Sequence, residues 1–454
     1  MSKLEVDKID PQSGTALEIG SSGDTITIPA GVTFDSSAAT NTLPATVVTT
    51  DGTQTLTNKS IAATQLTGTV ATSNLGTGTA DATTFLRGDQ TYASATPAAG
   101  SITTTQLAYN PNSFRNIIIN GDMSIAQRAT SVSGITGNGY FTLDRFNTPL
   151  SSLGTWTQSQ STDVPSGQGF ARSFKIECTT ANASPSSGAY FLFRQSFEGQ
   201  NLQYLKKGTA NAESLTASFW VKSNKTGTYI LELEDADNIR SISKSYTINS
   251  ADTWEKKTIT FAGDTTGTLD NDNANSFHFT FWLGAGTDYT SGTLATSWGS
   301  VTSANRAVGN VNLADSTSNY LNITGVQLEA GTTASDFEFL PYDVNKTRCK
   351  RYFQKTMVAY MIGGWTGLHW SGSAHIGQFP IETELRTNAT VAYGSTFAVL
   401  GGGGVSSGYT VSGGTQTSYG MVTLTLSGTQ RASSETLTFY SDDSNTFISF
   451  DAEL

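Results

Sequence analysis

The stretch "SFHFTFWLGAG", residues 276–286, alternates large apolar residues with smaller or polar ones. In a β-strand successive side chains point to opposite faces, so this pattern buries one face and leaves the other polar. Short runs of the same kind lie on both sides of it, each bounded by Gly, Asn, Asp or Ser: "GAYFLFRQSF" (188–197), "SLTASFWVKSN" (214–224), "GTYILELEDA" (227–236) and "NYLNITGVQLEAG" (319–331). Several such strands predict an antiparallel β-sandwich, which we place at residues 114–343.

Composition supports an all-β protein. The chain has 454 residues, which is enough for two or three domains; only 14% of them are charged, 45 are glycine, and Ser and Thr are abundant. The net charge of −11 argues against a nucleic-acid-binding protein, because phosphate contacts need clustered Lys and Arg. The two cysteines, Cys178 and Cys349, are expected to be buried free thiols, since two residues give no disulfide framework.

Nothing in the sequence predicts secretion or membrane insertion. The first residues, "MSKLEVDKIDPQSG", have no apolar core of a signal peptide, and no stretch approaches the length of apolar residues that spans a bilayer. We therefore expect synthesis in a cytoplasm without export by the usual route.

Residues 1–113 differ from the rest of the chain. They contain no Trp and few other aromatic residues, so one isolated copy cannot bury a core of ordinary density. Disorder is one interpretation. The other is a thin fibre in which several copies share a narrow core, and singly recurring apolar residues favour it. We predict a tail-attachment segment at 1–40 and an intertwined homotrimeric stalk at 41–113.

A basic segment follows the sandwich. "LPYDVNKTRCKRYFQKT", residues 340–356, predicts a hinge with one or two helical turns capped by Asp343. Beyond it, the pattern of short strands predicts a smaller C-terminal β-domain, residues 344–454.

Several stretches, in their order along the chain, resemble tail-fibre proteins of tailed bacteriophages. They are "TQLTGTVATSNLGTGTADATTFLRGDQTYAS" (64–94), "NIIINGDMSIAQR" (116–128), "GYFTLDRF" (139–146), "NITGVQLEAGTTASDFEFLPYDVNKTRCKRYFQK" (322–355), "FPIETELRTNATVAY" (379–393) and the terminal "DAEL". The resemblance implies a jelly-roll domain similar to carbohydrate-binding modules, and an N-terminus that docks on the tail hub or an adaptor protein. It also implies that Arg87-Gly88-Asp89 is a stalk turn and not an integrin-binding loop.

Aromatic residues near polar ones are the candidates for glycan binding, because an indole stacks on the apolar face of a pyranose. "GGWTGLHWSGSAH", residues 363–375, places Trp365, His369 and Trp370 in a Gly-rich stretch expected to be loop-like at the receptor-binding tip. The alternative for these residues is the core or a trimer interface. Trp156, Trp282 and Trp298 are alternative candidates in the sandwich.

Metal and catalytic sites have weaker signals. The resemblance implies that Asn120, Asp122 and Glu329 could hold a structural calcium ion; the alternative is turn residues plus one surface acid. No cofactor is required. Glu232 and Glu234 share one strand face, which is more typical of a solvated surface than of a catalytic pair from two strands. We therefore expect no enzymatic activity.

The sequence as a whole predicts a non-catalytic tail fibre that is assembled in the host bacterial cytoplasm, becomes part of the virion and attaches it to a host surface polysaccharide. A tail-associated polysaccharide depolymerase is the first alternative. A purely structural tail or virion decoration protein is the second.

Overall fold

The structure, a computed structural model, is all-β apart from a few helical turns. With side chains it describes residues 114–356, 381–392 and 447–454. For the remaining C-terminal strands it describes the backbone, and before residue 114 it describes two short strands and a few single positions. The chain divides into two compact units, residues 1–96 and 97–454, which we describe separately.

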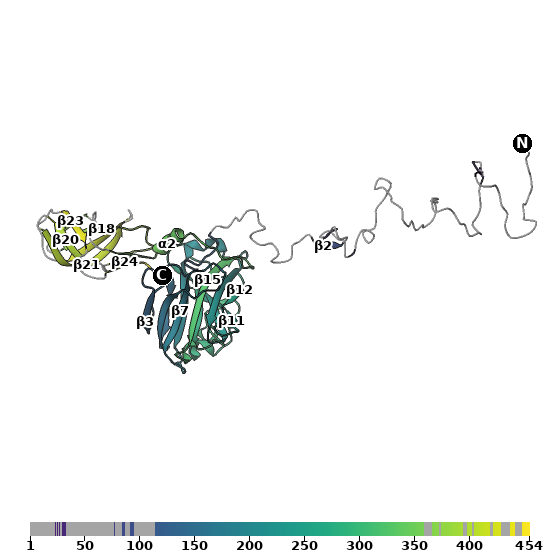
Figure 1. The fold of residues 1–454 in the computed structure, drawn as a ribbon, viewed down its shortest axis with the longest axis horizontal. Coiled ribbons are helices and arrows are strands. Elements are labelled where there is room, and N and C mark those ends of the chain that lie inside the picture. The colour runs from purple at the N-terminus through teal and green to yellow at the C-terminus, as the bar shows by residue number, and fades with distance from the viewer. Residues whose placement is uncertain are drawn as a thin grey trace, which may run out of the picture. The chain divides into compact units, whose positions relative to one another are not determined.

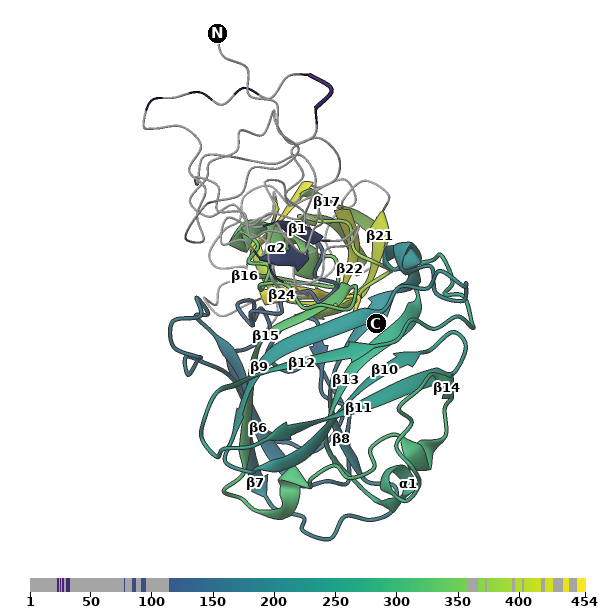
Figure 2. The ribbon, with the colours of Figure 1, turned by 90° about the vertical axis from the view of Figure 1, so that its right-hand side faces the viewer.

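Two antiparallel sheets form a β-sandwich in the second unit, as the sequence predicts (Figure 1, Figure 2). One sheet has the order β14-β11-β10-β13-β8-β4, with β5 also pairing β8, and we call it the front sheet whatever the view in the figures. The other has the order β12-β9-β15-β7-β6-β3, and we call it the back sheet. The front strands are β4 (Phe146–Asn147), β5 (Leu150–Ser151), β8 (Tyr190–Glu198), β10 (Gly227–Asp235), β11 (Arg240–Ile248), β13 (Asn275–Ala285) and β14 (Gly299–Ser300). The back strands are β3 (Ser131–Ile135), β6 (Thr155–Ser161), β7 (Ser173–Thr180), β9 (Leu215–Ser223), β12 (Glu255–Phe261) and β15 (Tyr320–Ala330).

Aromatic side chains fill the space between the sheets. Phe193 of β8 stacks on Phe174 of β7, with ring centroids 3.9 Å apart, and on Phe146 of β4, at 4.6 Å. Phe279 and Phe281 of β13 are fully buried in the same core, so the alternation in "SFHFTFWLGAG" does select the inward face. Both cysteines are buried free thiols, as expected.

An irregularity in β15 depends on a glycine. The pairing of β15 with β9 shifts between Thr324 and Gln327, and Gly325 within this shift has φ +61°. A Cβ at Gly325 would lie 2.5 Å from the ring of Phe170. Glycine therefore lets the backbone adopt a left-handed conformation and lets the ring approach.

In the residues that the structure describes, helical structure is limited to short segments. It comprises α1 (Thr287–Thr290), α2 (Tyr342–Lys350) and the 3₁₀ turns Gly199–Asn201, Gln203–Leu205, Ser303–Asn305 and Leu313–Asp315. The predicted helix after the sandwich is α2, but its predicted cap is wrong: Pro341 holds the capping position, and no side chain caps the helix. Asp343 lies in the first turn, where its charge favours the positive end of the helix dipole. No helix in the described residues is long and apolar enough to cross a membrane.

The C-terminal strands form a small sheet and a closed barrel. The three-stranded sheet has the order β16-β24-β19, and the barrel has the order β17-β18-β22-β21-β20-β23. The strands are β16 (Phe353–Met357), β17 (Thr366–Ser371), β18 (Ala374–Pro380), β19 (Thr390–Tyr393), β20 (Phe397–Gly401), β21 (Gly404–Thr417), β22 (Met421–Ser427), β23 (Thr436–Tyr440) and β24 (Phe447–Asp451).

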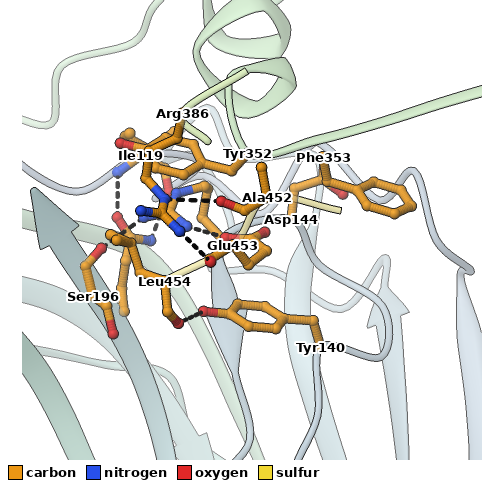
Figure 3. Close-up of polar contacts among 12 residues, drawn as sticks. Ile119, Tyr140, Asp144, Ser196, Tyr352, Phe353, Arg386, Ala452, Glu453 and Leu454 are labelled. Atoms are coloured by element: carbon orange, nitrogen blue, oxygen red, sulfur yellow. Dashed lines mark hydrogen bonds and ion pairs between the residues drawn. The ribbon is translucent and has the colours of Figure 1, made fainter. Parts of the chain in front are cut away.

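The last residues of the chain are anchored to the sandwich (Figure 3). Arg145, which is fully buried, pairs with Glu453, and the Tyr140 hydroxyl donates to the Leu454 carbonyl over 2.9 Å. Arg386 donates to the carbonyls of Ala452 and Glu453, each at 2.9 Å. These contacts cross the predicted boundary at residues 343/344, so the small sheet and the sandwich form one packed body.

In the first unit, the strands β1 (Thr84–Leu86) and β2 (Tyr92–Ser94) pair as an antiparallel hairpin. They flank Arg87-Gly88-Asp89, which itself lies outside the described residues. Phe85 and Leu86 are 52% and 42% exposed. The predicted trimer and the tail-attachment segment at 1–40 are not tested by these strands and stay predictions.

Candidate functional site

The outer face of the front sheet carries a polar groove. Phe191 and Phe193 of β8 face the core. The alternate residues of the strand, Tyr190, Leu192 and Arg194, therefore face outward. By the same alternation, β13 presents His278 and Trp282, and β10 presents Glu232 and Glu234. The loop after β13 folds over this face and adds Tyr289 and Arg306. Tyr190 and Arg306, which are 116 positions apart in the sequence, therefore line the same surface.

The floor of the groove is a small apolar cluster. Leu192, Ile230, Trp282 and Ala307 are buried together there, apart from the main core. The Tyr289 ring centroid lies 5.3 Å from that of Trp282 and 5.8 Å from that of Tyr190, in the second case edge-on. These contacts fix the orientation of both half-buried tyrosines.

Arg306, which lines the groove, pairs with two glutamates of β10. Arg306 makes a bidentate ion pair with Glu232, at 2.7 and 2.8 Å, and a third bond of 2.7 Å with Glu234. Glu232 also accepts from the Trp282 indole at 3.0 Å. Burial opposes the charge of Arg306, but the two carboxylates outweigh it and raise its pKa. The predicted solvated position of Glu232 is wrong, because Arg306 and Trp282 cover it completely.

The two glutamates have opposite pKa shifts. Burial raises the pKa of Glu232, and the charge of Arg306 offsets this only in part. Burial also opposes ionisation of Glu234, but the hydrogen bond from His278 and the charge of Arg306 outweigh it and lower the pKa of Glu234 to about 2. Glu234 therefore remains ionised at neutral pH, whereas Glu232 depends on Arg306 for its charge.

His278 is held neutral beside Glu234. Its Nδ1 lies 3.2 Å from Glu234 and its Nε2 lies 2.8 Å from the Asn275 amide nitrogen. Burial lowers the pKa of His278, and the charge of Glu234 does not fully compensate. With Asn275 donating to Nε2, the Nδ1–H is free to donate to Glu234.

The groove has the size and chemistry of a small-ligand site. Its volume is about 370 Å³, and its rim is lined by amides and the Arg194 guanidinium. Arg194 donates to the Thr280 hydroxyl at 3.0 Å and lies 3.6 Å from Glu234. Half-buried tyrosine rings beside fixed polar groups can stack on a sugar face and bond its hydroxyls.

The structure tests the predicted glycan-binding residues only in part. Trp365 lies outside the described residues, and the side chains of His369 and Trp370 are not described. The expected loop is wrong: residues 366–371 and 374–380 form the hairpin β17–β18, with His369 opposite His375. The register shifts between His369 and Ser371, so Trp370 lies at a bulge.

The three alternative indoles named from the sequence, Trp156, Trp282 and Trp298, lie in different surroundings. Trp156 is fully buried in the main core and donates to the Leu153 carbonyl, so it cannot stack on a ligand. Trp298 is half-buried and donates to the Ala262 carbonyl. Trp282 alone of the three belongs to the groove. Tyr289 and Arg306 were missed because the sequence gives no sign that the loop after β13 returns to this face. Tyr190 lies in the predicted strand at 188–197 but was not singled out as a candidate.

The residues proposed for calcium do not fit a shared ion. The Asn120 oxygen accepts from the Ile125 amide, and Asp122 bonds Ser124 and Asn345. Glu329 accepts from Ser335 and lies 3.7 Å from Arg115. The oxygens of Asn120 and Glu329 and the Oδ1 of Asp122 thus accept from protein donors, and a guanidinium lies beside Glu329. Within the described residues, no three His, Cys, Asp or Glu side chains form a metal-binding group.

Comparison with known proteins identifies no family. No protein-family model matches the chain, and no curated protein matches it. Among solved structures, it is similar to the enzymatically active domain of tailspike protein 4 from bacteriophage CBA120, with 14% identity over 48% of this chain and 21% of that one and a TM-score of 0.26. The chain thus spans about a fifth of that tailspike domain.

Two carbohydrate-binding domains are similar at the same level. A family 11 carbohydrate-binding module from Clostridium thermocellum has 12% identity over 45% of this chain and 97% of that one, with a TM-score of 0.24. The N-terminal cellulose-binding domain of β-1,4-glucanase C from Cellulomonas fimi has 10% identity over 39% and 85%, with a TM-score of 0.21. TM-scores and sequence identities this low give no basis for assigning a function to this chain.

Proposed function

We propose that the chain is a phage tail fibre that attaches the virion to a bacterial surface glycan without cleaving it, and that the groove of the front sheet holds the glycan. One observation carries the proposal. Tyr190 and Tyr289 contact each other in a groove of about 370 Å³ that is also lined by hydrogen-bonded polar side chains. The tail-fibre assignment is supported by the order of sequence motifs.

The arrangement of the carboxylates favours binding over hydrolysis. A glycosidase needs two carboxyl groups flanking the scissile bond, one of which delivers a proton. Glu232 has no exposed surface, and both of its oxygens are bonded to Arg306. Glu234 has a pKa near 2 and cannot act as a proton donor at neutral pH. The depolymerase alternative would require release of oligosaccharides from the host polysaccharide, which a reducing-end assay measures.

Assembly would add to the affinity of each groove. A trimer presents three copies of the site, and their effective concentration multiplies a weak single-site affinity. In this proposal residues 1–40 join the fibre to the tail hub or adaptor, and the stalk carries the sandwiches outward. A purely structural protein is the remaining alternative, and normal adsorption of virions that lack the chain would support it.

Substitution in the groove tests the proposal. We expect Tyr289→Ala and Tyr190→Ala each to weaken binding to host polysaccharide about tenfold, because each removes a stacking ring. Tyr342→Ala is the matched control, since Tyr342 is 60% exposed on α2 and lies outside the groove. Calorimetric titration gives the affinity, and thermal melting confirms folding.

Normally melting Tyr190 and Tyr289 variants that bind at wild-type affinity would reject the groove. Trp365→Ala and Trp370→Ala then become the decisive variants, because those residues remain the predicted glycan contacts of the C-terminal domain. If they alone abolish adsorption, the receptor site lies in the barrel segment.

A further inference from the structure

A second cavity, of about 420 Å³, lies where the sandwich begins. Its lining comes from residues 114–119, from the end of β8 and the turns after it, and from α2 and the two residues that follow it. Two of its aromatic side chains face solvent: Phe114 is 58% exposed and Tyr204 is 50% exposed. The amides of Gln200 and Asn201 complete one side. None of these residues belongs to the groove of the front sheet.

The carboxylate that lines this cavity is already neutralised. Glu198 has no exposed surface and accepts two bonds from Arg351, at 2.8 and 2.7 Å, together with bonds of 2.5 Å from Tyr352 and Gln200. Burial opposes its ionisation, but the bonds from Arg351 and Tyr352 outweigh burial and lower the pKa of Glu198. Arg351 and Glu198 therefore neutralise each other, and this pair leaves no net charge for a ligand.

Arg348 is the second guanidinium of the cavity, and among the described residues it has no hydrogen-bonding partner for its buried Nη1. Glu338, the carboxylate whose charge acts on Arg348, accepts from the backbone amides of Phe114 and Asn116, at 2.7 and 2.8 Å. Burial lowers the pKa of Arg348 and the surrounding charges restore it only in part. A buried guanidinium donor without an acceptor is costly, so an oxygen ligand here would be stabilising.

The segment directly before the cavity has no acidic side chain. Residues 90–113, which lead to the cavity at Phe114, contain no Asp or Glu. The nearest upstream carboxylate in the sequence is Asp89. Residues 90–113 therefore offer no carboxylate to Arg348.

We propose that this cavity is a second ligand site that binds an oxyanion on Arg348, and that the anion is the carboxylate or phosphate of an acidic sugar. Guanidinium pairs with both groups through parallel N–H bonds. Tyr204 and Phe114 flank the entrance and can cover the apolar face of the ring, while Gln200 and Asn201 can bond its hydroxyls. The choice of a sugar as the carrier rests on the proposed function; the anion site itself does not.

Titration of the full chain with three probes tests this site: D-glucuronate, D-glucose and inorganic phosphate. We expect saturable binding of glucuronate, and weaker or no binding of glucose. Arg348→Gln should weaken glucuronate about tenfold or more, because a charge-assisted pair is lost. Lys346→Gln is the matched control: it removes one positive charge from the same helix at a residue outside the cavity lining.

Further variants separate the possible outcomes. Tyr204→Ala should weaken glucuronate and leave phosphate unchanged, and it keeps the test valid if Arg348→Gln does not fold. Tyr289→Ala should leave both probes unchanged, so failure of the groove and failure of this cavity are distinguishable. Binding of phosphate alone that depends on Arg348 supports the anion site with phosphate as the group recognised. Absence of binding by both anions, or a folded Arg348→Gln chain with wild-type affinity, overturns the proposal.

Discussion

Arg145 and Glu453 form a fully buried ion pair between the sandwich and the last strand's extension. Arg145 also donates to the Ser196 carbonyl at 2.6 Å and lies 3.4 Å from the ring centre of Tyr352. Removing one partner of such a pair leaves a buried charge without compensation. We expect Glu453→Gln to lower the free energy of unfolding by about 3–5 kcal/mol.

Urea unfolding measures this loss, with Glu382→Gln as the control. Glu382 also pairs with a basic residue, Lys350, but its side chain is 68% exposed. Its loss should cost less than about 1 kcal/mol. Equal losses in the two variants would contradict the account of the buried pair.

Asp144 gives a prediction about pH. Burial raises its pKa from 3.8 to about 6, against the hydrogen bonds from Gln127 and the charge of Arg128. Between about pH 4 and pH 6 the folded chain keeps a proton that the unfolded chain has lost, so stability decreases as pH rises through this window. Asp144→Asn cannot ionise. Its stability relative to wild type should therefore increase by about 1–3 kcal/mol from pH 4 to pH 7.

Urea midpoints at several pH values, measured for both chains, give this difference. Glu234, whose pKa is shifted the opposite way, is common to both chains and cancels. A constant difference across the pH range would show that Asp144 titrates normally.

Single residues also show what the sequence could predict of the groove. Alternation correctly predicted that Glu232 and Glu234 share a face of one strand. It could not predict that Arg306 pairs with both and that Glu232 is fully buried, because Arg306 lies 72 positions beyond Glu234 on an irregular loop. Charge burial is a tertiary property, and local pattern does not contain it.

At the scale of elements, β15 depends on Gly325. We expect Gly325→Ala to destabilise the sandwich by about 1–3 kcal/mol, because the backbone is left-handed there and the new methyl meets the Phe170 ring. Gly299→Ala in β14 should be close to neutral, since a Cβ there meets nothing within 4 Å. Thermal melting compares the two, and similar melting temperatures would mean that the sheet absorbs the extra methyl.

The elements that sequence reasoning recovered are those with strong alternation. The long strands of the sandwich, such as β13 and β15, combine a continuous aromatic or aliphatic face with turn residues at both ends. The hairpin β17–β18 was missed because Gly and Ser interrupt its pattern, and those residues usually mark loops. In the barrel, pairing with neighbouring strands overrides that local preference.

At the scale of the whole molecule, the exposed hairpin of the first unit bears on assembly. Phe85 and Leu86 are adjacent apolar side chains with about half of their surface exposed in one chain. The predicted trimer would bury them against other copies. We expect three chains per particle for the full-length protein and a lower number for a chain that starts at residue 114.

Sedimentation equilibrium at micromolar concentration determines both masses. A Phe85→Ser, Leu86→Ser double variant should shift the full-length protein toward smaller species. A full-length chain that sediments as a monomer would exclude the trimer.

The connection between the barrel strands and the small sheet has a mechanical consequence. The chain leaves this sheet after Met357, returns to it at Thr390, leaves again after Tyr393 and returns at Phe447. Met357 pairs with Phe447, and Tyr393 pairs with the next residue, Ile448, so these exits and the final return lie at one end of the sheet. Tension applied to the barrel segment is therefore shared by four backbone crossings. In a domain joined by a single linker, one backbone crossing would carry the whole force.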